Sequence, residues 1–447
     1  MQTKRLSRHR PNEQGQTIIF VAISIVSLLA MATLAIDIVT FYVARSEIQR
    51  AADAAALAGA KAVADSGYTT LPASDPNYAA AQTLAQTLAT ASVNAMLTTP
   101  AINLVAGQLP VLVGPPSFDF TTHPGSYQVA VSLKSATLPT FFSKIWSRNA
   151  AFVTASATAE AYNPANLATF TPIAPLSLKP WLVANVDPHN ATPFVNILTG
   201  VVEESVTGEQ LNLIPDCKNG QPTCQLRFSH NPPKANPPDE VDYVPLQVSS
   251  PPNTRNVCPA CAAGTTDYEQ SIACADTTAY VTPSCGGGAT NAVWSDTFNP
   301  RGLAGLSATG TECLIHAAGP GPWDGATNLQ DKLNFPGWPA TPAQITAESG
   351  PQTGNLVTTS SSIVTIPIID TSMAPNTFPV SPGAVTVVGF MQAFINQIDP
   401  NPGPPTPGDI NITVLNISGC SNIDNGANPV VGGSGTSPIP VRLITSP

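Results

Sequence analysis

Residues 15–67 read GQTIIFVAISIVSLLAMATLAIDIVTFYVARSEIQRAADAAALAGAKAVADSG, and this stretch decides how the chain is organised. Its first part, Ile18 to Ile36, contains nineteen residues without a charge. In a helix this segment reaches about 28 Å, close to the roughly 30 Å hydrocarbon core of a bilayer. No later segment is comparably long and apolar. The sequence therefore predicts one transmembrane helix, with the lipid bilayer as its partner.

The charges before this helix predict its orientation. Four basic residues and a single acid precede it, namely Lys4, Arg5, Arg8, Arg10 and Glu13. Segments rich in Lys and Arg stay on the cytoplasmic side of a membrane. We therefore expect a cytoplasmic N-terminus and an exported body.

A cleaved signal peptide is the alternative interpretation of the same segment. Ala30-Met31-Ala32 has the small-x-small pattern that signal peptidase requires. No helix breaker precedes it, however, and helical sequence continues to about Asp65. We favour an uncleaved anchor, and the body is exported in either case.

The helix is expected to continue past the membrane as an Ala-rich segment that ends at Gly67. Between Ala51 and Ala64, nine of fourteen residues are Ala, the strongest helix former. Small residues form two stripes, Ala52, Ala56, Ala60 and Ala64 on one and Ala51, Ala55 and Gly59 on the other. Such stripes allow close approach of another helix, and packing against a partner or within the same domain are equally supported. Asp37, just past the apolar run, is interpreted as a marker of the membrane boundary.

The composition suits an exported, β-rich protein. Apolar residues make up 43% of the chain, whereas charged residues make up only 10%, well below the roughly 25% of an average soluble protein. Beyond Gln14 the chain carries 14 basic and 27 acidic residues, a net charge of −13. Because phosphate binding needs clustered Lys and Arg, we expect no nucleic-acid partner.

The rest of the sequence predicts an α+β protein. A helix at 77–96 and strands at 101–106, 117–121, 126–134 and 152–162 make a small membrane-proximal unit. Pro-rich loops then separate short β-prone runs, of which 360–370, 384–398 and 410–420 are the most strand-like. We divide the chain into a basic cytoplasmic tail (1–15), the transmembrane and juxtamembrane helix (16–66), the α+β unit (67–165), a β-rich, disulfide-containing exported domain (166–420) and a loosely ordered tail (421–447).

All eight cysteines lie in the C-terminal half, at 217, 224, 258, 261, 274, 285, 313 and 420. An even number confined to an exported region predicts disulfides, at least three of them, but no particular pairing. Cys258-Pro259-Ala260-Cys261 is a C-x-x-C, a spacing also used in redox catalysis. Its surroundings predict a loop without the flanking strand and following helix of a redox fold, so structural disulfides are favoured.

No constellation of catalytic residues emerges, and we expect no catalytic, cofactor or metal site and no small-molecule substrate. The five histidines (His9, His123, His189, His230 and His316) occur in no metal-binding spacing, and His316 is interpreted as structural. Asp239-Glu240 and Asp242 could bind calcium, but a solvated acidic loop explains them more simply. Asn190, Asn411 and Asn416 stand in N-x-S/T sequons.

Residues 15–60 resemble the N-terminal signature of the TadE/TadG-like proteins of Flp (tight adherence) pilus assembly. The matching features are the basic head, Gly15, the apolar span, Ala35-Ile36-Asp37, Phe41-Tyr42 and the run from Ile48 to Ala58. A second stretch, 129–161, is also similar to the family. Phe20 stands where pilins carry Glu, which favours an anchored TadG-like protein over a cleaved pilin-like subunit.

The resemblance also directs attention to a metal motif. Many TadG-like proteins contain a von Willebrand A domain with a metal-binding D-x-S-x-S. Asp370-Thr371-Ser372-Met373-Ala374 starts this motif after an apolar strand, but Ala374 replaces its last hydroxyl ligand. Pro375 also opposes the helix that should follow, so we expect no such site.

The resemblance implies a non-enzymatic, membrane-anchored structural component of an Flp/Tad-type pilus assembly or secretion apparatus, in the bacterial inner (cytoplasmic) membrane with its body periplasmic or extracellular. Its partners would be other pilus-assembly proteins, reached through the Ala-rich helix and the exported domain. An anchored surface adhesin or binding module is the alternative. An exported enzyme is the least supported interpretation.

Overall fold

The structure of the protein is a computed structural model. It describes residues 14–70, 78–98, 110–122, 126–135, 138, 152–162, 173–174, 178–189, 192–196, 202, 207–215, 239–246, 258, 261, 266–274, 292–293, 300–316, 331–334, 344–347, 362–370, 384–398, 409–419, 430–431, 439 and 441–444.

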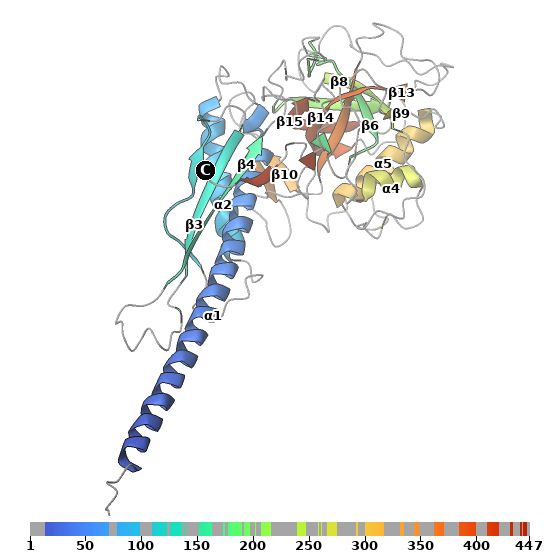
Figure 1. Cartoon of the computed structure of the whole chain (residues 1–447). Coiled ribbons are helices and arrows are strands. Elements are labelled where there is room, and N and C mark those ends of the chain that lie inside the picture. The colour runs from blue at the N-terminus through green and yellow to red at the C-terminus, as the bar shows by residue number, and fades with distance from the viewer. Residues whose placement is uncertain are drawn as a thin grey trace, which may run out of the picture.

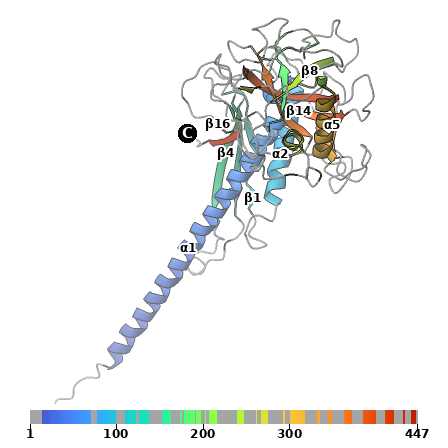
Figure 2. The same cartoon turned by 90° about the vertical axis from the view of Figure 1, so that its right-hand side faces the viewer.

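The first helix, α1 (Gln14–Asp65), runs without interruption for 52 residues, or about 78 Å. Figures 1 and 2 show it as a rod whose N-terminal half projects away from the other labelled elements. The helix ends at Gly67, which has a φ of +79°, a backbone conformation that residues other than glycine rarely adopt. A Cβ at Gly67 would also lie 2.5 Å from the carbonyl oxygen of Leu415. The prediction of one continuous helix that ends at Gly67 is confirmed.

The C-terminal half of α1 belongs to a helix–sheet unit. It packs with α2 (Tyr78–Thr98) on an antiparallel five-stranded sheet of order β1-β3-β4-β17, in which β2 also pairs with β3. The strands are β1 (Val111–Leu112), β2 (Ser117–Asp119), β3 (Ser126–Lys134), β4 (Thr154–Tyr162) and β17 (Val441–Ile444). Alternate residues of β3, from Tyr127 to Leu133, face the core formed with the helices.

The strand β17 comes from the end of the chain, in the segment that the sequence suggested to be loosely ordered. That expectation does not hold for these residues, because Val441–Ile444 pairs with β4. Arg442 binds Glu160 across the two strands, with 2.5 Å between Nε and Oε1, and its guanidinium lies over the ring of Tyr162. Ile439 is buried in the same core. The chain therefore closes its first unit with its last strand.

The second unit is a closed six-stranded barrel of order β12-β14-β15-β7-β8-β6. Its strands are β6 (Trp181–Ala184), β7 (Gln210–Pro215), β8 (Asp239–Pro245), β12 (Ile363–Ile369), β14 (Val387–Ile398) and β15 (Ile410–Gly419). The pairs β6–β12 and β7–β8 are parallel, and the other four are antiparallel. Alternate residues of the strands fill the interior, as small barrels require. Three later strand-like runs of the sequence thus correspond to β12, to β15, and to β14 with the short β13.

Two helices lie beside the barrel, α4 (Asp267–Ala273) and α5 (Pro300–His316). The sequence interpretation of a loop after the C-x-x-C is wrong at α4. Thr266 and Glu269 form a reciprocal capping box that starts this helix.

The remaining described elements are short. They are the 3-10 turn η1 (Tyr68–Thr70) and the strand pairs β5 (Ile173–Ala174) with β16 (Val430–Val431), β9 (Ala292–Val293) with β13 (Ala384–Val385), and β10 (Asp331–Asn334) with β11 (Gln344–Ala347). The strand expected at 101–106 lies outside the described residues. The α+β class, with a long apolar helix followed by β-rich, disulfide-containing structure, is confirmed.

Candidate functional site

The N-terminal half of α1 presents a predominantly apolar surface without charged side chains from Ile18 to Ile36. Apart from the partly buried Phe41, its large apolar side chains between Ile18 and Val43 have exposed fractions from 43% at Leu34 to 76% at Tyr42. Among the described residues, α1 is the one helix long and apolar enough to cross a membrane, and its most apolar window has none of its residues buried. A core helix of a soluble protein would bury such side chains. This surface is the first candidate site.

The hydroxyl groups in this apolar segment are satisfied within the helix. Ser24 and Ser27 donate to the carbonyl oxygens of Phe20 and Ile23, each at 2.8 Å. Thr33 and Thr40 make the same contact one turn back. Polar groups exposed to lipid are costly unless they are hydrogen-bonded inside the segment. These hydroxyls therefore add little to the cost of placing the segment in hydrocarbon.

Asp37 differs from its exposed neighbours. Only 3% of its surface is accessible, whereas Ile36 and Ile38 are more than half exposed. The expected boundary residue therefore has its carboxyl group covered by the folded protein instead of facing outward.

The Ala-rich stripes lie inside the helix–sheet unit. Ala52, Ala56, Ala60 and Ala64 have no exposed surface. A Cβ added at Gly59 would meet Val129 of β3 at 2.9 Å and Val93 of α2 at 3.0 Å. Of the two interpretations of the stripes, the structure shows packing within the same chain, so the stripes are not a free surface for a partner.

The end of α1 is joined to the barrel by buried polar groups. Asn416 of β15 donates from Nδ2 to the carbonyl oxygen of Ala64, 2.7 Å away, and to Gln392 of β14. Gln392 in turn donates to Asp65, whose other oxygen binds Lys61 at 2.5 Å.

The turn after the helix joins the same network. The hydroxyls of Thr69 and Thr70 both donate to the side-chain oxygen of Asn416. The last carbonyl groups of a helix have no partner within the helix and need a donor from elsewhere. For the carbonyl of Ala64 this donor is Asn416 of β15. The barrel therefore caps the helix that carries the apolar surface.

The apolar surface and most of the tight Ala face belong to one stretch of chain, and a protein-family model matches this stretch. Residues 15–62 match the family model "Putative Flp pilus-assembly TadE/G-like". No curated protein and no solved structure matches the chain. The TadE/G-like segment thus covers the apolar half of α1 and most of its buried half. The family suggests involvement in Flp pilus assembly, and with the apolar helix it suggests a membrane-anchored protein.

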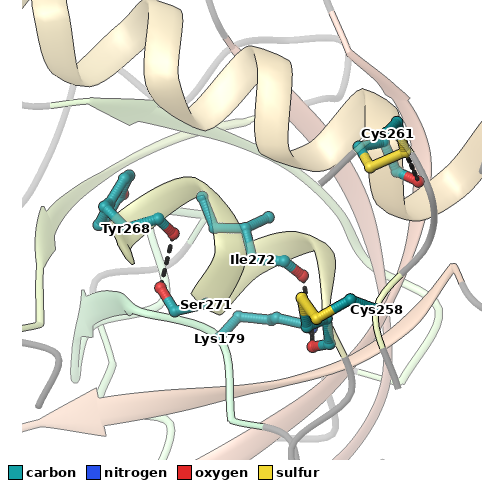
Figure 3. Close-up of a disulfide and its surroundings, with 8 residues drawn as sticks. Lys179, Cys258, Cys261, Tyr268, Ser271 and Ile272 are labelled. Carbon is teal, nitrogen blue, oxygen red and sulfur yellow. Dashed lines mark hydrogen bonds between the residues drawn. A yellow bond between two sulfur atoms is a disulfide. The ribbon is translucent and has the colours of Figure 1, made fainter. Parts of the chain in front are cut away.

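Outside the TadE/G-like segment, two disulfides fasten α4 and α5. Cys258 pairs with Cys274 and Cys261 pairs with Cys313, so the two cysteines of the C-x-x-C bind different partners. Figure 3 shows the first disulfide beside Lys179, which is buried and donates to the carbonyl oxygens of Ile272 and Cys274 at 2.6 and 3.1 Å. This ammonium group satisfies the C-terminal end of α4. The C-x-x-C is therefore structural here, and the other four cysteines lie outside the described residues.

The remaining sequence candidates are spread over the second unit. Asp370 directly follows β12, and the rest of its motif lies outside the described residues. Asn416 of the third sequon is wholly buried, so it is not a glycosylation site in the folded protein. Asp239 is also buried and begins β8, so its interpretation as part of a solvated loop is wrong.

One group that sequence spacing did not reveal combines a histidine with two carboxylates. His189, Glu209 and Asp239 place one ligand atom each within 4.8 Å of one another, and these are residue types that bind metals. They are separated by 20 and 30 positions in the chain, which no short motif describes.

Proposed function

We propose that this protein is a membrane-anchored structural component of an Flp/Tad-type pilus assembly or secretion apparatus. The single observation that carries the proposal is the match of residues 15–62 to the TadE/G-like family. The geometry of the same residues supports it, since the matched segment combines an exposed apolar half with a half that is built into a folded domain.

We place the N-terminus in the cytoplasm and the body on the other side of a bacterial inner membrane. Four basic residues before the apolar span and none within it support this orientation. The disulfides of the second unit fit an oxidising compartment. The body would then be periplasmic or extracellular.

The role we propose is mechanical and not catalytic. The helix that enters the membrane continues into a core, and the carbonyl oxygen of Ala64 near its end accepts a hydrogen bond from Asn416 of the barrel. Contacts to other assembly proteins would use the exposed surfaces of the exported units, because the Ala stripes are already occupied by α2 and the sheet. A change of position at the membrane would thus reach the exported units through packed structure.

The proposal is tested by deleting the gene in its own host and counting surface pili, with complementation by wild type or by Leu28→Arg. Leu28 is exposed at the middle of the apolar surface. An Arg there opposes insertion by about 2.5–3.5 kcal/mol, so this variant should lose carbonate-resistant membrane association and fail to restore pili. Leu28→Ile is the matched control and should restore both.

Protease added to intact spheroplasts should digest the body and leave a tag on the N-terminus protected. Normal pilus numbers in the deletion strain together with reduced surface attachment would refute the pilus proposal and favour the adhesin alternative. Recovery of a soluble form that begins near Thr33 would refute anchoring.

A further inference from the structure

The group of His189, Glu209 and Asp239 lies at one end of the barrel. Strand β8 runs parallel to β7 and antiparallel to β6, with Val183 opposite Tyr243. The end of β6 and the beginnings of β7 and β8 therefore meet at the same edge. His189 follows β6, Glu209 directly precedes β7, and Asp239 is the first residue of β8.

The two carboxylates continue rows of side chains that face the barrel interior. On β7 the row is Leu211 and Leu213, and on β8 it is Val241 and Tyr243, all of them in the barrel core. Because side chains alternate along a strand, residues two positions earlier lie on the same side. Glu209 and Asp239 occupy these positions, and only 9% and 4% of their surfaces are exposed. The apolar barrel thus ends in two buried acids.

The histidine lies between these acids and solvent. Nδ1 of His189 is 3.1 Å from Oδ2 of Asp239, and 55% of the histidine side chain is exposed. The three ligand atoms lie within 4.8 Å of one another. Ligands about 2.1 Å from a tetrahedral ion lie about 3.4 Å apart. Side-chain rotations that bring these atoms closer by up to about 1.4 Å would complete such a set.

The backbone around the group is held in place. The amide of His189 donates to Oδ1 of Asp187 at 2.8 Å, and Asp187 is itself buried. On the other side, the carbonyl oxygen of Glu209 accepts from Val414 of β15 at 2.9 Å. Gly208, with a φ of +94°, turns the chain into β7 directly before Glu209. Three ligands from separate segments are therefore presented by fixed backbone, which is the condition for a preformed site.

We propose that His189, Glu209 and Asp239 bind one divalent transition-metal cation at the end of the barrel. Two like charges held close together in a buried place disfavour each other, and a dication offsets both. The imidazole nitrogen distinguishes the set from a calcium site, in which all ligands are oxygen. Because His189 is exposed, water can occupy the remaining coordination positions. The ion would connect the segment after β6, the residue before β7 and the first residue of β8, and so stabilise this edge of the barrel.

The test uses the full-length protein in detergent, treated with EDTA and freed of chelator. Equilibrium dialysis against Zn²⁺, with metal measured by atomic emission, should find one ion per chain, and the ion should raise the midpoint of thermal unfolding. His189→Ala should weaken Zn²⁺ binding at least about 100-fold, since even loss of an outer partner costs about 10- to 100-fold. Asp239→Asn should act in the same direction.

Glu240→Gln is the matched control, because Glu240 is the next residue of β8 and its side chain points to the other side of the strand. It should retain wild-type binding. Thiol counts and circular dichroism identify any variant that has not folded. The metal titration of the wild-type protein tests the proposal even if every variant fails to fold. Absence of stoichiometric Zn²⁺ or Mn²⁺ binding by wild type would overturn the proposal. Equal binding by His189→Ala, or Ca²⁺ binding that His189→Ala leaves unchanged, would also overturn it.

Discussion

Gly59→Ala tests whether the small residues of α1 are required by close packing. In an open helix this substitution stabilises by about 1 kcal/mol, because Ala is the better helix former. At Gly59 the new Cβ would lie 2.9 Å from Val129 and 3.0 Å from Val93, both of which have no exposed surface. Ordinary contacts begin near 3.4 Å, so two packed elements must move. Overpacking of this kind costs about 1–3 kcal/mol. The net expectation is a destabilisation of up to about 2 kcal/mol.

A pair of glycines in α5 provides the control for this estimate. A Cβ at Gly305 would meet no atom within 4 Å, whereas one at Gly310 would lie 2.9 Å from Cβ of Ile272 in α4. Gly305→Ala should therefore gain the full helix propensity of about 1 kcal/mol. Gly310→Ala should lose stability for the same reason as Gly59→Ala.

Hydrogen-exchange mass spectrometry of the full-length protein in detergent measures the local stability of α1 and of α5 separately. The comparison therefore does not require that the two units unfold together. A change of 1 kcal/mol alters local exchange about fivefold, and 2 kcal/mol about 30-fold. Exchange in α1 should become up to about 30-fold faster in Gly59→Ala, and exchange in α5 about fivefold slower in Gly305→Ala. If Gly59→Ala slowed exchange in α1 as Gly305→Ala does in α5, the close-packing argument would be wrong.

Three further predictions concern the two folded units. Asn416→Ala should destabilise the junction by about 1–3 kcal/mol or more, since it leaves the buried carbonyl of Ala64 without its donor, and limited proteolysis should then release the barrel from α1. Burial raises the pKa of Tyr162 to about 12, and this effect exceeds the opposite effect of the Arg442 charge. The neutral phenol therefore stabilises the fold below pH 10, and this contribution is lost as the pH rises toward 12. Tyr162→Phe should reduce the fall of the melting midpoint over this pH range. Mass spectrometry without reduction should find the Cys258–Cys274 and Cys261–Cys313 pairs. Their loops of 16 and 52 residues correspond to stabilisation of the fold by about 3 and about 4 kcal/mol. A Cys258–Cys261 bond would contradict the structure.

The parts of the fold that the sequence predicted well are those with strong local signals. The strand at 126–134 is β3, residue for residue, because its apolar and polar side chains alternate. The run at 360–370 contains β12, because its centre is rich in β-branched residues. The end of α1 was predictable because Gly67 tolerates a positive φ. The capping box of Thr266 and Glu269 was also a local signal, and reading it would have located α4.

Features that depend on distant partners could not be predicted in the same way. The pairing of β17 with β4 joins Val441 to Ala161 across 280 positions, and a four-residue strand in a Gly- and Pro-rich tail has little signal of its own. The same holds for the group of His189, Glu209 and Asp239, which only the register of three barrel strands brings together. Spacing rules find ligands on one helix or one turn, and they do not find ligands at the rim of a barrel.

The continuity of α1 determines how the apolar surface relates to the two folded units. Breaking a helix between its exposed and buried halves would need a Pro, a bulge or an inserted side chain, and the sequence from Gln16 to Val63 contains no Pro. A tilt of the apolar half therefore moves Ala64 at the other end, and the bonds from Asn416 and Gln392 carry that motion into two neighbouring strands of the barrel. The polar junction is buried, so breaking its hydrogen bonds would leave buried groups without partners at a cost of about 1–3 kcal/mol each. For this reason the position of the barrel follows the position of the helix, and a protein built in this way is suited to hold a folded domain at a fixed place beside a membrane.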